Sequence, residues 1–288
     1  MLRRDPITGV QRLVAPGRAS DLRPTIRGCP FCAGNEGATP ASTGERARRE
    51  STPTDAVWSA RAFPNRFPLT DPHELVVPSP RHCTSWRDLA LPELQDGLSL
   101  LLERRAALQT ASPERYVHAF ANDGPAAGAS VAHVHAQLVV LDRGAHTERL
   151  VANVRDEGSC AICGLLDDPE LLVERGRHHA VIAHPTPRLA GGLLLVPTGH
   201  RAAPDPDRLA EFAELLHRAW MTLDADTDAN CWLVADEAAG AHWYLELQPR
   251  GANLAGVELA LGLNVSAADA RETAQLARTR LGKPSPRA

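Results

Sequence analysis

Hydrophobic residues recur with a helical period in three segments of the chain. Residues 91–110 carry one leucine stripe and have Pro92 in the first turn, a position that proline tolerates. Residues 207–223 repeat the pattern with leucine and phenylalanine, and residues 267–281 form an alanine-rich version of it. The spacing predicts three helices, each with one face on a hydrophobic core.

Short runs of leucine and β-branched residues between these segments predict strands. One run, Gln137–Leu141, follows the segment His133-Val-His135-Ala-Gln137, in which polar and apolar residues alternate. On a strand, this period of two places His133, His135 and Gln137 on one face. Because a Gly128-Ala-Ser130 turn precedes them, the three nitrogen-bearing side chains suit a phosphate group better than a packed core. The alternative is a half-buried strand whose two histidines are satisfied by internal hydrogen bonds.

The order of motifs and elements occurs twice along the chain. In each copy a C-x-x-C turn is followed by a strand ending in Val-Pro, a histidine, a helix, a strand and a second histidine. The two sets are Cys29, Cys32, His82 and His133, then Cys160, Cys163, His200 and His242. We therefore predict a duplicated α+β unit, with an N-terminal domain at residues 1–150 and a C-terminal domain at residues 151–288. Tyr244 stands in the second copy where His135 stands in the first.

The composition is that of an ordinary soluble globular protein. Of the 288 residues, 43% are hydrophobic and 23% are charged, and the formal net charge is -4. Nothing in this balance predicts a nucleic-acid or membrane partner. The first residues lack the apolar core of a signal peptide, so the expected location is the cytoplasm. Residues 43–54 are rich in arginine and glutamate and predict a solvated loop.

The six cysteines indicate metal binding rather than a disulfide framework. Four of them form the two C-x-x-C turns, each of which presents two thiolates suited to a tetrahedral zinc ion. The histidines of each copy complete a Cys2His2 set. Such a set leaves no open coordination position, so we expect two structural zinc ions per chain. Cys83 and Cys231 are left over and are expected to be buried.

With these motifs in order, the chain resembles the galactose-1-phosphate uridylyltransferase family, the transferase branch of the histidine-triad superfamily. The resemblance runs nearly end to end. It rests on Arg4–Gly9, Cys29-Pro-Phe-Cys32-Ala-Gly-Asn-Glu36, Phe63-Pro-Asn65, Ser79-Pro-Arg-His82, Asn122-Asp-Gly124 and the His133-Val-His135-Ala-Gln137 motif. It implies two histidine-triad-like units whose antiparallel sheets carry helices on one face. The family commonly forms homodimers.

The resemblance also implies roles for individual residues. His135 would be the nucleophile, forming a covalent nucleotidyl-histidine, and Gln137 would donate a hydrogen bond to the transferred phosphate. Two arginines, two asparagines and the turn before the motif would bind substrate: Arg18, Arg23, Asn65, Asn122, Gly128 and Ser130. Neutral imidazole is nucleophilic near pH 7, and glutamine at the third position favours transfer over hydrolysis.

Three functions are open at this point. The leading one is UDP-glucose–hexose-1-phosphate uridylyl transfer, with a nucleotide sugar and a hexose 1-phosphate as substrates. The second is an ADP-sugar phosphorylase with phosphate as acceptor, because valine stands between the two histidines where the uridylyltransferases usually have proline. The second Cys2His2 set also resembles the two-zinc phosphorylases. The third is a non-catalytic nucleotide-binding protein that has kept the fold.

Overall fold

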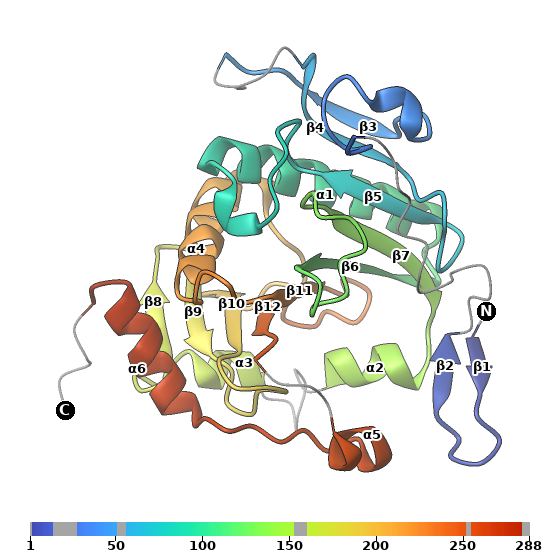
Figure 1. Cartoon of the computed structure of the whole chain (residues 1–288). Helices are drawn as coiled ribbons and strands as arrows, with labels where there is room; N and C mark the ends of the chain where they lie inside the picture. The colour runs from blue at the N-terminus through green and yellow to red at the C-terminus, as the bar shows by residue number, and fades with distance from the viewer. Residues whose placement is uncertain (1, 14–27, 51–55, 153–159, 252–254, 284–288) are drawn as a thin grey trace.

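The computed structural model describes residues 2–13, 28–50, 56–152, 160–251 and 255–283, and its centre is one antiparallel sheet of ten strands (Figure 1). The strands follow the order β3-β4-β5-β7-β6-β11-β12-β10-β9-β8. The first copy supplies β3 (Gly44–Ala47), β4 (Trp58–Pro64), β5 (His73–Val77), β6 (Arg115–Asp123) and β7 (Ala136–Asp142). The second supplies β8 (Leu172–Arg175), β9 (His179–Ala183), β10 (Leu193–Pro197), β11 (Ala229–Val234) and β12 (Tyr244–Pro249). A separate hairpin pairs β1 (Leu2–Arg4) with β2 (Gln11–Leu13).

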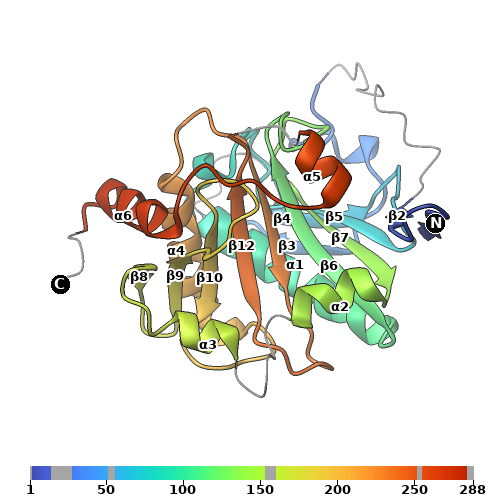
Figure 2. The same cartoon turned by 90° about the horizontal axis from the view of Figure 1, so that it is seen from below.

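Helices cover the sheet unequally on its two faces. The long helices α1 (Leu91–Ala111) and α4 (Leu209–Met221) lie behind the sheet in Figure 2 and contact each other. The helix α6 (Ala270–Arg280) packs on β8 and β9. Shorter helices α2 (Ala145–Ala152), α3 (Ala161–Leu165) and α5 (Gly256–Leu261) lie in front in the same view. No helix in the described ranges is both long and apolar enough to span a bilayer.

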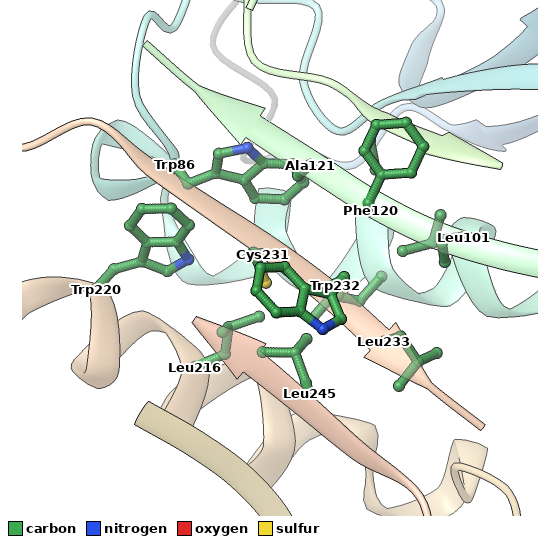
Figure 3. A pocket seen from close by; sticks show the side chains of 13 residues that line it. Trp86, Leu101, Phe120, Ala121, Leu216, Trp220, Cys231, Trp232, Leu233 and Leu245 are labelled. Atoms are coloured by element: carbon green, nitrogen blue, oxygen red, sulfur yellow. The ribbon is translucent and has the colours of Figure 1, made fainter. Parts of the chain in front are cut away.

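The main core fills the space between the sheet and the helices α1 and α4. It contains a small apolar cavity lined by Trp86 and Trp220, by leucines of both helices, and by residues of the central strands, among them Phe120 and Trp232 (Figure 3). Cys231 belongs to this lining, and Cys83 is buried in the same core. Both leftover cysteines are therefore buried, as predicted. The walls offer almost no polar groups, so the cavity belongs to the packing and is no candidate for a polar substrate.

The three predicted helices correspond to α1, α4 and α6, and the α+β class with an antiparallel sheet is confirmed. Two local expectations were wrong. Residues 44–47 of the expected loop form the edge strand β3, because their backbone pairs with β4. The strand β7 begins at Ala136, so His133 and His135 precede it. The chain bends there because the Val134 amide bonds to the Cys83 carbonyl at 2.9 Å.

The two copies meet at the middle of the sheet, where β6 pairs with β11. Phe120 and Trp232 lie directly opposite each other in this pair. From this central pair toward either edge of the sheet, the two copies place equivalent strands in the same order. On one side the order is β7, β5, β4 and β3, and on the other it is β12, β10, β9 and β8. The division into domains at residues 150 and 151 stays a prediction.

Candidate active site

The first Cys2His2 set comes together beside the lead-in to β7. Cys29 and Cys32 lie on the turn before β3, His82 follows β5, and His133 precedes β7; their ligand atoms all lie within 4.8 Å of one another. The His133 Nδ1 lies 3.4 Å from the Cys29 Sγ and 3.6 Å from the Cys32 Sγ. Zinc–sulfur bonds of about 2.3 Å and zinc–nitrogen bonds of about 2.0 Å in a tetrahedron give a separation of about 3.5 Å. The residues therefore fit a tetrahedral metal ion.

Hydrogen bonds and burial prepare His133 as a metal ligand. Its Nε2 lies 3.0 Å from the Ser79 carbonyl oxygen, so Nε2–H donates and Nδ1 keeps its lone pair. Burial lowers the pKa of His133 to about 4, which keeps the ring neutral at pH 7. Burial and the neighbouring Cys29 raise the pKa of Cys32 to about 11. A bound cation would hold this thiol as thiolate at neutral pH.

The second Cys2His2 set repeats this arrangement beside β12. Cys160, Cys163, His200 and His242 also have all ligand atoms within 4.8 Å of one another. The His242 Nδ1 lies 3.3 Å from the Cys160 Sγ, and its Nε2 lies 3.2 Å from the Pro197 carbonyl oxygen. The Cys163 Sγ lies 3.9 Å from the His200 Nδ1. Two clusters that could hold a metal are thus present, and all eight predicted ligands belong to them.

The ring of His135 is held by the backbone of His133. The His135 Nδ1 lies 2.9 Å from the His133 carbonyl oxygen, which can only accept. The Nδ1–H therefore donates, and the lone pair of a neutral ring lies on Nε2. Phe31, from the first C-x-x-C turn, packs edge-on against His135 with ring centroids 5.3 Å apart. The sequence offered no sign of this contact, although the turn that carries Phe31 was recognised.

Gln137 has a buried partner, His73, for which the sequence predicted no role. The His73 side chain, on β5, accepts a hydrogen bond from the Leu69 amide at Nδ1, over 2.9 Å. Its Nε2 lies 3.1 Å from the Gln137 Oε1, so a neutral ring donates there. Because this bond engages the Oε1 of Gln137, it fixes the orientation of the amide, and the NH2 group is the part that can donate to a ligand. Asn65 joins the same group, because its Nδ2 lies 3.4 Å from the His73 Nδ1, which can accept.

A polar cleft of about 500 Å³ opens beside residues 129–134, just before His135, and neither His135 nor Gln137 belongs to its lining. Its lining includes Asn122, Ser130 and part of His133. The Asn122 Oδ1 accepts a hydrogen bond of 2.9 Å from Asn230 of β11, so the second copy fixes a predicted substrate-binding side chain of the first. Gly128 adopts a φ of +89°, and a Cβ there would lie 3.9 Å from the Asn122 Nδ2. This turn therefore favours glycine.

The cleft also carries an acidic wall. Asp123 accepts hydrogen bonds from the Ser85 hydroxyl at 2.8 Å and the Trp86 amide at 3.2 Å. Burial nevertheless raises the pKa of Asp123 to about 6. Asp228 lies in the same lining. Arg18 and Arg23, the predicted phosphate-binding arginines, lie outside the described residues.

Comparisons with known proteins agree with this architecture. The HIT domain family matches residues 58–143, which run from β4 to the end of β7. A curated ADP-glucose phosphorylase from Arabidopsis thaliana is 21% identical over 335 residues, which cover 96% of this chain and 92% of that protein.

Two solved structures share the fold over nearly the whole chain. An ADP-glucose phosphorylase from Arabidopsis thaliana with bound ADP-glucose has a TM-score of 0.77 at 21% identity, covering 96% of this chain and 98% of its own. A uridylyltransferase structure has a TM-score of 0.78 at 21% identity, covering 98% of both chains. Residues 58–143 therefore match the HIT domain family, and the chain shares the fold of these two solved structures over nearly its whole length.

Proposed function

We propose that the protein transfers a nucleoside monophosphate group from a nucleotide sugar to a phosphate-bearing acceptor, with His135 as the nucleophile. The observation that carries this proposal is the hydrogen bond from the His135 Nδ1 to the His133 carbonyl, which places the lone pair of the neutral ring on Nε2, the nitrogen proposed to attack. The names of the relatives support nucleotidyl transfer as the type of reaction.

The reaction proceeds in two displacements at the same phosphorus atom. The Nε2 of His135 bonds to the α-phosphorus of the nucleotide sugar while the bond from phosphorus to the bridging oxygen breaks, and the sugar 1-phosphate leaves with that electron pair. A phosphate oxygen of the acceptor then bonds to phosphorus as the nitrogen–phosphorus bond breaks. Because the leaving group is a phosphate, neither step needs a strong general acid. The Gln137 amide donates to the phosphoryl oxygens.

Two substrate pairs fit this chemistry. The first is UDP-glucose with galactose 1-phosphate, as the sequence motifs predict. The second is ADP-glucose with inorganic phosphate, which the curated relative and the second Cys2His2 cluster favour. Nucleotide-sugar binding is common to both. The cytoplasmic location, the domain division and a homodimer remain part of the proposal.

We further propose zinc as the metal of both clusters. The thiolate and imidazole donors and their separations suit zinc in a closed tetrahedral site. The first ion would fix His133 and through its carbonyl the ring of His135. The second ion would fix His242, whose neighbour Tyr244 is no nucleophile of this kind.

The test is the intact mass of the protein after incubation with UDP-glucose and, separately, with ADP-glucose, without acceptor. A uridylyl adduct that galactose 1-phosphate discharges supports the first pair. An adenylyl adduct that inorganic phosphate discharges supports the second. Absence of any adduct from either donor contradicts covalent transfer and favours a nucleotide-binding protein.

A further inference from the structure

A row of four side chains crosses the centre of the sheet. Gln137 of β7 pairs with Phe120 of β6, Phe120 pairs with Trp232 of β11, and Trp232 pairs with Glu246 of β12. Directly paired residues of antiparallel strands project from the same face. Their chain neighbours, such as Ala119, Leu233 and Leu245, belong to the core under α1 and α4. The row therefore lies on the opposite face, which is the face of the candidate active site.

Glu246 occupies in the second copy the place that Gln137 occupies in the first. Each lies four residues after the buried metal-cluster histidine of its copy, His133 or His242, and each is buried. The row is symmetric about the pair of Phe120 and Trp232, with Gln137 at one end and Glu246 at the other. The duplication thus placed a carboxylate where the first copy has an amide.

The Glu246 carboxylate is buried without being satisfied. Its side chain belongs to a residue that is 3% exposed, and its Oε1 has no hydrogen-bond partner among the residues described here. Burial raises the pKa of Glu246 to about 7, and the charge of Arg188 opposes that rise. An unsatisfied buried acceptor costs free energy, which a hydroxyl donor from a ligand would recover.

Trp232 and Arg188 complete the surroundings of this carboxylate. The Arg188 guanidinium lies over the Trp232 ring, 5.8 Å from its centroid. Arg188 itself is exposed, whereas Glu246 behind it is buried. The loop that carries Arg188 is fixed by Gln248, whose amide donates to the Leu189 carbonyl at 2.9 Å and accepts from the Leu189 amide at 3.4 Å.

An aromatic face, a carboxylate and a guanidinium are the groups that recognise a sugar ring. The C–H face of a sugar packs on an aromatic ring, its hydroxyls donate to a carboxylate, and its oxygens accept from a guanidinium. Three strand spacings of about 4.8 Å put the backbones of Gln137 and Glu246 ~14 Å apart. A phosphate at Gln137 and a sugar reaching toward Glu246 fit within that length once both side chains extend toward the ligand.

We infer that Glu246 determines specificity for the sugar of the sugar 1-phosphate, by accepting hydrogen bonds from its hydroxyls while the ring lies against Trp232 and Arg188. This inference rests on the proposed function, since it presumes that the nucleotidyl group is held at His135. It assigns the second copy a part in substrate recognition, although that copy has tyrosine in place of the nucleophile.

The experiment compares an acceptor that carries a sugar with one that does not. The nucleotidyl-enzyme is formed with excess donor, freed of small molecules, and mixed with either glucose 1-phosphate or inorganic phosphate. Discharge is followed by intact mass. Glu246→Ala is expected to lower the second-order rate of discharge by glucose 1-phosphate roughly 10- to 100-fold relative to the native chain. Discharge by inorganic phosphate, which has no sugar, is expected to stay within about twofold.

Two further variants keep the test decisive. Glu246→Gln retains the size of the side chain and one acceptor oxygen, so its loss should be smaller; it replaces the alanine variant if that protein does not fold. Glu237→Ala removes one negative charge from the connection between β11 and β12, where the side chain is 56% exposed, and should change neither rate. Equal discharge rates in the native and Glu246 variants, or equal losses with both acceptors, would overturn the inference. Failure of the native chain to form an adduct would instead contradict the proposed function.

Discussion

The His133 backbone carbonyl accepts the Nδ1–H of His135 at 2.9 Å, while the His133 ring faces the first pair of cysteines. One residue therefore joins the metal cluster to the candidate nucleophile. Because the Ser79 carbonyl fixes the other nitrogen of the His133 ring, that residue has little freedom to turn. The position and tautomer of His135 therefore depend on His133 and on the metal cluster that holds it. The first prediction tests His135, and the second tests the metal cluster.

Replacement of His135 by alanine is expected to abolish adduct formation, with a loss of at least about 10³-fold in turnover, because no other group supplies the attacking lone pair. Tyr244→Phe is the matched variant, since Tyr244 stands at the same place in the second copy. Its hydroxyl donates to the Leu150 carbonyl at 3.3 Å. We expect Tyr244→Phe to retain turnover; comparable losses in both variants would contradict the assignment of a single nucleophile.

Loss of the two metal clusters is expected to have different consequences. Cys29→Ser should remove one metal equivalent and lower turnover at least tenfold, because His133 then no longer fixes His135. Cys160→Ser should also remove one equivalent and lower the melting temperature, but should change turnover much less. Metal content by elemental analysis, melting temperature and turnover check this. Cys83→Ala is the control for losing a thiol and should keep both metals. A Cys160→Ser protein as inactive as Cys29→Ser would refute the separation of roles.

His73 is expected to position Gln137. In His73→Phe the Gln137 Oε1 loses its hydrogen-bond partner at 3.1 Å, so the side-chain amide can rotate and exchange the positions of its oxygen and nitrogen. Turnover should fall roughly 10- to 100-fold, as for other residues that hold a catalytic donor. His73→Gln keeps an NH2 donor of similar reach and should recover part of the rate. The kinetic readout is kcat rather than KM, because the bond affects the phosphate in the transition state. A change in KM alone would refute the positioning role.

Much of the site could be predicted because its residues come in spaced motifs. The eight metal ligands are four pairs at matching places of a repeat, so Cys29 and His133 could be joined although 104 residues separate them. Tyr244 in place of His135 indicates that the second copy has no nucleophile of this kind, but no motif in the sequence singles out Glu246.

The remaining parts depend on strand register, which a single sequence does not encode in a motif. His73 lies next to Gln137 only because β5 pairs with β7, and Asn230 holds Asn122 only because β6 pairs with β11. The sequence predicts that the strand includes His133 and His135, whereas β7 begins at Ala136. Polar and apolar residues also alternate in an extended segment that bonds to a loop instead of to a strand, so the pattern alone does not mark where the strand begins. The carbonyl of Cys83, to which Val134 bonds, has no sequence signature.

His118 is expected to make the protein sensitive to acid. Its ring stacks between Tyr116 and Phe120 on β6, with centroid distances of 6.2 Å and 5.5 Å. Desolvation, assisted by Arg105, lowers the pKa of His118 to about 4 from 6.5. The folded state therefore binds fewer protons than the unfolded state between these values. The free energy of unfolding keeps this contribution above pH 6.5 and loses it as the pH falls toward 4. At about 1.36 kcal/mol per pKa unit, the loss is on the order of 3 kcal/mol.

Phenylalanine at position 118 would keep the stack and remove the titration. Urea unfolding of the native chain and of His118→Phe, each at several pH values between 4 and 8, measures the difference directly. The two curves of unfolding free energy against pH should run parallel above pH 6.5, and the native curve should fall relative to the His118→Phe curve below it, because only the native chain loses the histidine contribution. His217→Phe offers a comparison at a histidine of α4 outside this stack. Parallel curves down to pH 4 would mean that His118 is protonated equally in both states, and would exclude it as the source of acid sensitivity.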